Sequence, residues 1–179
     1  MGGINIKNTI ILELLDKATL KFSYFMLIMI MNLSVGDLTP EFEGLATDGK
    51  IVSNETIKGK WTVLFFYPKA FTPGCTNEVC SIRDNYSNLK KYDINIYGIS
   101  RDDLETQKKF KEKYNLPYEL ISDKDGKIIK AFKIEGPFGL AQRKTFIINP
   151  EGKIVYIFEK VNTKNHANEV EEVLKKLIQ

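Results

Sequence analysis

Trp61-Thr62-Val63-Leu64-Phe65-Phe66-Tyr67-Pro68 is the stretch of sequence from which the fold can be argued. Its nearly unbroken apolar, β-branched and aromatic side chains predict a central strand buried on both faces, which Pro68 ends. After a short turn, residues 76–92 are predicted to form a helix. The apolar residues of that segment recur at helical spacing and share one face; they are Val79, Ile82, Tyr86 and Leu89.

The remainder of the chain continues this alternation of strands and helices. Strands are predicted at 94–99, 118–121, 144–148 and 153–158, the last two joined by a hairpin turn at 149–152. Helices are predicted at 102–114, 128–132 and 168–178, with Ser100 as the N-cap of the first. This order predicts an α/β fold with a mixed central sheet and helices on both faces.

Length and charge narrow the class of protein. The chain has 179 residues, of which 43% are hydrophobic, which suits one domain with its own core. Its 26 basic and 23 acidic residues are mixed along the chain and give a net charge of only +3. This balance predicts an ordinary solvated surface without a nucleic-acid-binding patch.

Residues 1–31 differ in composition from the rest and are interpreted as an N-terminal extension, with the domain at 32–179. All four methionines lie there, and residues 22–31 form an apolar run. The run is too short for a membrane span, and charged residues precede it, so no stable membrane insertion is expected. Three interpretations stay open: a dispensable extension or a true start at Met31, a signal peptide before Ser34-Val35-Gly36, and an amphipathic helix.

Two cysteines, Cys75 and Cys80, are the only ones in the chain, and His166 is the only histidine. Two cysteines are too few for a secreted disulfide framework or an iron–sulfur cluster, and two cysteines with one histidine are too few for a zinc site. No metal or other cofactor is therefore expected. The spacing of the two cysteines leaves two interpretations: a pair of inert buried thiols or a redox pair. His166 is expected at the surface near a helix start, without a catalytic role.

The surroundings of Cys75 favour a redox role. The sulfur follows Thr72-Pro73-Gly74 at the point where the predicted helix begins. A helix N-terminus presents unpaired N–H groups and the positive end of the helix dipole, which favour a thiolate, the nucleophilic form of cysteine. Cys75 is therefore the candidate attacking sulfur.

The same residues resemble the peroxiredoxin family. Pro68-x-x-x-Thr72-x-x-Cys75 matches its active-site motif, and Glu78 and Cys80 are similar to its bacterioferritin-comigratory, or peroxiredoxin Q, branch. Further matches follow in order along the domain: Val35-Gly36-Asp37, Gly98-Ile99-Ser100 with Asp102, Leu116-Pro117, and Arg143 ahead of Thr145-Phe146-Ile147-Ile148. The chain departs from the branch at Ala70-Phe71, where the branch usually has Asp-Asn.

The resemblance implies a thioredoxin-like fold and a thiol-dependent peroxidase acting on hydrogen peroxide and organic hydroperoxides. In that family Cys75 would form a sulfenic acid and Cys80 would resolve it as a disulfide, which thioredoxin or a similar dithiol would reduce. Thr72 would bind the peroxide and Arg143 would stabilise developing charge. Pro68 would shield the sulfenic acid, and Glu78 would orient Arg143. A cytoplasmic monomer or weak homodimer is expected.

Two other functions are compatible with a pair of thiols. A thiol–disulfide oxidoreductase would normally need Cys-x-x-Cys, whereas four residues separate Cys75 and Cys80 here. A non-catalytic peroxide sensor would react once instead of turning over. Helix geometry adds a constraint, since residues five apart on one helix have Cα atoms ~8.7 Å apart. A disulfide tolerates at most about 7 Å, so the helix around Cys80 is expected to open when the disulfide forms.

Overall fold

The computed structural model describes residues 32–178, and the interpretations of residues 1–31 lie outside this range. Within it, seven strands form one sheet in the order β2-β1-β5-β4-β3-β6-β7. The parallel pairs β3–β4 and β4–β5 lie beside the antiparallel pairs β3–β6, β6–β7, β1–β2 and β1–β5. This confirms the predicted mixed sheet.

The strands and helices lie along the chain in the following order. They are β1 (Glu43–Ala46), β2 (Ile51–Ser53), α2 (Asn54–Ile57), β3 (Thr62–Phe66), α3 (Pro73–Asp84), α4 (Tyr86–Lys90), β4 (Asn95–Ser100), α5 (Leu104–Lys113), β5 (Glu119–Ser122), α6 (Lys127–Ala131), a 3-10 turn η1 (Pro137–Gly139), β6 (Lys144–Ile148), β7 (Ile154–Phe158) and α7 (His166–Leu177).

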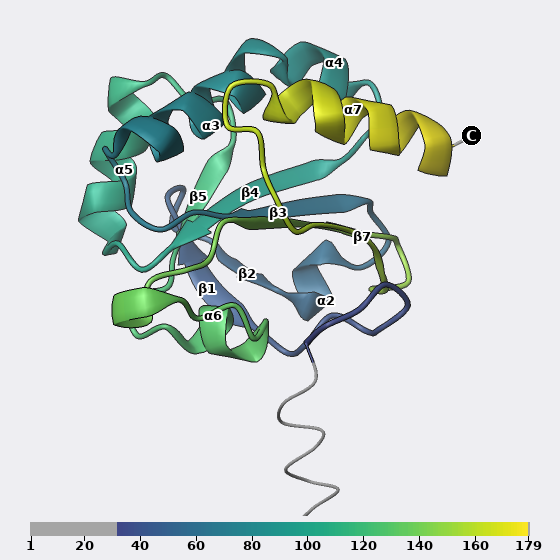
Figure 1. Cartoon of the computed structure of the whole chain (residues 1–179), viewed down its shortest axis with the longest axis horizontal. Coiled ribbons are helices and arrows are strands. Elements are labelled where there is room, and N and C mark those ends of the chain that lie inside the picture. The colour runs from purple at the N-terminus through teal and green to yellow at the C-terminus, as the bar shows by residue number, and fades with distance from the viewer. Residues whose placement is uncertain (1–31, 179) are drawn as a thin grey trace, which may run out of the picture. The chain divides into compact units, whose positions relative to one another are not determined.

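Helices cover both faces of the sheet, with α3, α4 and α7 on one face and α2 and α6 on the other (Figure 1). Strand β3 explains why. All five of its residues are buried, and side chains alternate between faces along a strand. Val63 and Phe65 enter the core under α3 and α7, whereas Phe66 packs against Phe132 and Phe146 on the α6 side.

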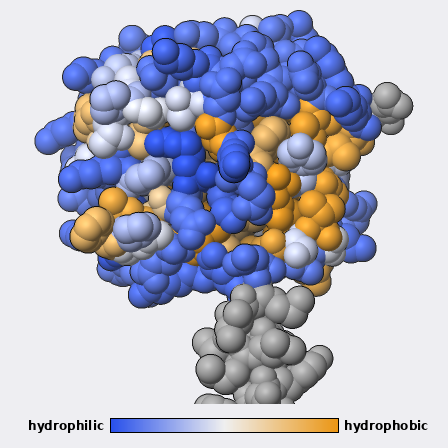
Figure 2. Space-filling model, viewed as in Figure 1, coloured by the Kyte–Doolittle hydropathy of each residue, from blue (hydrophilic) through white to orange (hydrophobic). Residues whose placement is uncertain are grey.

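The edge of the sheet at β7 differs in polarity from the helical face. Figure 2 shows apolar side chains gathered beside β7, below α7, while the surface over α3, α4 and α7 is mostly hydrophilic. None of the helices in residues 32–178 combines the length and the apolar character needed to cross a membrane.

Two local expectations need correction, and one hairpin was not predicted. The predicted helix at 76–92 is two helices, because Asn85 leaves helical geometry and its side-chain amide donates to the Ser81 carbonyl. The N-cap of α5 is Asp103, whose carboxylate accepts from Thr106 N, and not Ser100, which ends β4. The hairpin β1–β2, turning at Gly49 with φ of 84°, has no counterpart in the sequence-based expectation.

Candidate active site

Cys75 lies where the chain leaves the central strand and enters α3. The helix begins at Pro73, a residue suited to the first helical position because its missing N–H would be unpaired there in any case. Thr72 is the N-cap residue, and Thr76 N donates to its carbonyl. Cys75 is therefore in the first turn, next to the free N–H groups at the positive end of the helix dipole.

Sheet register brings Arg143 to this sulfur across 68 residues of sequence. Strands β3 and β6 are antiparallel, with Phe66 opposite Lys144, so Arg143 sits at the same end of the sheet where the chain turns toward Cys75. Arg143 Nη2 donates to Cys75 Sγ at 3.2 Å. The Cys75 side chain is fully buried, so this contact lies in a poorly solvated place where charge–charge interactions are strong.

Gly74 favours the close approach of that guanidinium. A Cβ atom at this position would lie 3.3 Å from Arg143 Nη2, tighter than ordinary side-chain contact. The glycine next to the cysteine thus leaves room for the arginine.

Glu78 holds the other side of the same guanidinium. Arg143 Nη1 donates to Glu78 Oε2, while Glu78 is fully buried and its Oε1 has no hydrogen-bond partner among the described residues. Burial raises the pKa of the Glu78 carboxyl to about 7, although the charge of Arg143 opposes this. Desolvation acts against the charged form of Arg143, yet Glu78 and the Cys75 contact together raise its pKa, so the guanidinium stays charged.

Thr72 and Pro68 occupy the loop between β3 and α3, and both are half-buried. The Thr72 hydroxyl donates to the Lys69 carbonyl at 2.9 Å, which leaves its oxygen lone pairs as acceptors. Pro68 follows the buried Tyr67 and contributes no N–H.

Cys80 is on α3 as well, and both cysteines are free thiols in this structure. Its side chain is half-buried, and desolvation raises the pKa of its thiol, with nearby Arg83 opposing. Because α3 is a continuous helix from Pro73 to Asp84, Cys75 and Cys80 occupy different faces, ~140° apart about its axis.

The expectation of a surface His166 is wrong. His166 begins α7 but is fully buried, with Nε2 2.8 Å from Thr145 Oγ1 and its ring edge-on to Phe158 at 5.1 Å. Burial, with a contribution from the charge of Arg143, lowers its pKa to about 4, so the imidazole is neutral at pH 7. The available signal was its spacing of four from Val170 and of eight from Leu174, which places it on the buried face of the helix.

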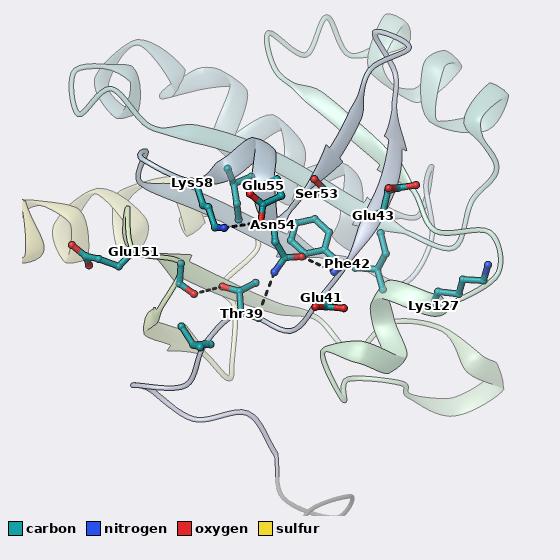
Figure 3. Close-up of a pocket in the computed structure, with 14 residues that line it drawn as sticks. Thr39, Glu41, Phe42, Glu43, Ser53, Asn54, Glu55, Lys58, Lys127 and Glu151 are labelled. Atoms are coloured by element: carbon teal, nitrogen blue, oxygen red, sulfur yellow. Dashed lines mark hydrogen bonds and ion pairs between the residues drawn. The ribbon is translucent and has the colours of Figure 1, made fainter.

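A separate hollow of about 790 Å³ lies between β1, α2 and α6 and is lined by Thr39, Phe42 and Asn54 among others (Figure 3). The Asn54 amide donates to the Thr39 and Pro40 carbonyls and accepts from Phe42 N, so its polar groups are satisfied. None of the predicted site residues lines this hollow.

A buried cysteine at a helix N-terminus, held by an arginine, in a mixed sheet with helices on both faces, defines a thiol-based redox protein. Comparison with known proteins specifies it further. The model of the AhpC/TSA family matches residues 35–157. The chain is 39% identical to peroxiredoxin Bcp of Bacillus subtilis over 152 residues, which cover 81% of this chain and 97% of that protein. It is 37% identical to chloroplastic peroxiredoxin Q of Triticum aestivum, covering 82% and 69%.

Solved structures agree with this assignment. A mutant of Xylella fastidiosa PrxQ superposes with a TM-score of 0.77 at 26% identity, covering 83% of this chain and 99% of that one. BcpB of Mycobacterium tuberculosis gives a TM-score of 0.75 at 30% identity, covering 83% and 100%. The chain belongs to the AhpC/TSA family and is a peroxiredoxin of thioredoxin-like fold, a thiol peroxidase.

From the burial of His166 we predict how its imidazole titrates. The unfolded chain takes up a proton on this residue near pH 6.5, whereas the folded protein does so only near pH 4. The unfolded state therefore binds more protons on His166 in between, and the contribution of His166 to the free energy of unfolding falls as the pH is lowered from about 6.5 to about 4. The single imidazole signal in NMR spectra should titrate with a pKa of about 4.

A His166→Gln variant is the control for the stability effect. Glu78, whose pKa is raised, changes stability in the opposite sense between its unfolded value and about 7, so only the difference between wild type and variant isolates His166. An imidazole that titrates near 6.5 in the folded protein would contradict its burial.

Proposed function

We propose that Cys75 is the peroxide-reducing thiol of this enzyme. Its thiolate attacks one oxygen of a hydroperoxide, the O–O bond breaks, and the leaving oxygen takes up a proton to become water or an alcohol. Cys75 is thereby oxidised to a sulfenic acid. The observation that carries this assignment is the 3.2 Å contact between Cys75 Sγ and Arg143 at the N-terminus of α3.

The neighbouring side chains have separate roles in this step. Arg143 stabilises the thiolate and the charge that builds on the leaving oxygen, and Glu78 orients the guanidinium from its other side. Thr72 accepts a hydrogen bond from the peroxide O–H, because its own hydroxyl hydrogen is already donated to Lys69. Pro68, beside the buried Tyr67, shields the sulfenic acid from water.

Cys80 completes the cycle as the resolving thiol. Its sulfur condenses with the Cys75 sulfenic acid, which releases water and forms an intramolecular disulfide. Thioredoxin or a similar dithiol reduces this disulfide by thiol–disulfide exchange and is itself oxidised. The enzyme works in this way in the cytoplasm as a monomer or weak homodimer, on hydrogen peroxide and on organic hydroperoxides. A solved structure of the Xanthomonas campestris bacterioferritin comigratory protein, 29% identical to this chain, concerns the alkyl peroxide reduction activity of that relative.

Turnover separates this proposal from a peroxide sensor. With excess peroxide and a recycling thioredoxin system, the wild-type protein should consume many equivalents, whereas a sensor would react once.

Cys75→Ser should show no turnover, because no other described cysteine lies at a helix start. Cys80→Ser should consume about one equivalent, stall as a sulfenic acid and convert to sulfinic acid at high peroxide. Mass spectrometry distinguishes these products, and full thioredoxin-coupled turnover by Cys80→Ser would refute its resolving role.

Arg143 has a separate prediction. Arg143→Ala should slow oxidation of Cys75 by peroxide about 10²–10³-fold, the usual loss when one transition-state charge partner is removed. Stopped-flow oxidation measures this rate directly. Arg143→Lys keeps the charge without the planar fork and should fall between wild type and Arg143→Ala. A rate unchanged in Arg143→Ala would leave this residue with a structural role only.

A further inference from the structure

The carboxylate of Asp102, which lies outside the Pro68-x-x-x-Thr72-x-x-Cys75 motif, holds the loop that leads to Cys75. Asp102 Oδ2 accepts the backbone N–H of Ala70 at 2.7 Å, and the same oxygen accepts from Ser100 Oγ at 2.7 Å. Ala70 lies between Pro68 and Thr72, in the middle of the loop, whereas Asp102 follows β4 and precedes α5. The loop is therefore fixed through its backbone by a side chain 32 residues away.

The same network reaches the other end of the loop. Gln107, fully buried on α5, donates from Nε2 to Ser100 Oγ at 2.8 Å and to the Ile121 carbonyl at 3.1 Å. Its Oε1 accepts from the Tyr67 hydroxyl. Tyr67 belongs to the same buried cluster as Cys75 and directly precedes Pro68. A connected set of hydrogen bonds thus ties down both Tyr67 and Ala70, on either side of Pro68 and Lys69.

The loop needs such support because its backbone is strained. Phe71 has φ of 64°, a left-handed conformation that costs an ordinary residue about 1–2 kcal/mol. Its ring packs edge-on against Phe110 at 4.9 Å, and Lys113 Nζ lies 5.5 Å from the ring centre. Both partners are on α5. The next residue is Thr72, so the conformation at Phe71 determines where the Thr72 hydroxyl lies relative to the sulfur.

We propose that Asp102 is a positioning residue for the peroxide reaction, acting through the Ala70 N–H to place Thr72 beside Cys75. The inference rests on the proposed roles of Cys75 and Thr72. Without this acceptor the loop relaxes toward unstrained backbone geometry, and Thr72 no longer aligns the peroxide with the sulfur. A displacement of about 1 Å in such a site can cost about 10²-fold in rate. The thiolate itself depends on α3 and Arg143 and remains reactive.

This mechanism separates two reactions of the same sulfur. Peroxide attack needs both the thiolate and an aligned O–O bond. Alkylation by iodoacetamide needs the thiolate but has no peroxide oxygen for Thr72 to hold. Loss of positioning therefore lowers the first rate and spares the second, whereas a general disturbance of the site lowers both.

The test measures both rates in a Cys80→Ser background, where Cys75 is the one remaining cysteine. Asp102→Ala should lower the rate of sulfenic acid formation with hydrogen peroxide about 10–100-fold and leave iodoacetamide alkylation within about twofold. Asp102→Asn keeps an oxygen acceptor for Ala70 N–H and should recover most of the peroxide rate. Asp103→Ala is the matched control, because this exposed neighbour caps α5 and has no bond to the loop; its peroxide rate should equal that of the background protein.

Several results would overturn the inference. These are an unchanged peroxide rate in Asp102→Ala, an equal fall in both rates, an Asp102→Asn variant as slow as Asp102→Ala, or an equal loss in Asp103→Ala. If Asp102→Ala does not fold, Asp102→Leu serves instead, because it also removes the acceptor for Ala70 N–H and is close to aspartate in size. It should lower only the peroxide rate, by the factor expected for Asp102→Ala, and an unchanged rate there also overturns the inference. A background protein whose Cys75 does not react with peroxide would instead refute the proposed function.

Discussion

The guanidinium of Arg143 is the contact on which the arrangement of this site depends. It bonds Cys75 Sγ on one side and the buried carboxyl of Glu78 on the other, and both partners lie within one turn of α3. This geometry rests on β6 beside β3 in antiparallel register, on the small residue Gly74, and on a helix that begins at Pro73. The pairing of β3 with β6 and the turn after β3 together bring a positive charge to a buried sulfur.

Helix α3 holds Cys75 in its first turn and also keeps it from Cys80. Its first turn presents free N–H groups beside Cys75, but its regular geometry places Cys80 on another face, with Cα atoms ~8.7 Å apart. Several contacts hold that part of the helix in place: Tyr118 donates to the Val79 carbonyl, Ser81 accepts from Ala167 N, and Arg83 donates to the Tyr114 carbonyl. Disulfide formation within one chain must break helical bonds and some of these contacts, which is local opening without global unfolding.

Much of the fold follows from local patterns in the sequence. Strand β3 was predictable because a strand buried on both faces has a nearly unbroken run of apolar residues. The apolar face of α3 was predictable because a helix buried on one face has apolar residues at helical spacing. The meeting of Arg143 with Cys75 was not predictable from such patterns, since it depends on strand register, and only the resemblance to peroxiredoxins indicated it. His166 was misplaced because histidine is intermediate in its tendency to be buried, and its spacing from Val170, which agrees with burial, was not used. The bond from Asp102 to Ala70 depends on backbone geometry in a loop, which no residue pattern encodes.

In the proposed cycle, helix α3 is intact in the reduced enzyme and must open around Cys80 in the oxidised one. Amide hydrogen exchange of the reduced protein and of the protein oxidised with one equivalent of peroxide tests it most directly. Oxidation should speed exchange between Thr76 and Tyr86, form a Cys75–Cys80 disulfide and leave the protection of β3 and β4 unchanged. An oxidised protein that contains this intramolecular disulfide and keeps full protection through Cys80 would contradict the proposed opening of α3.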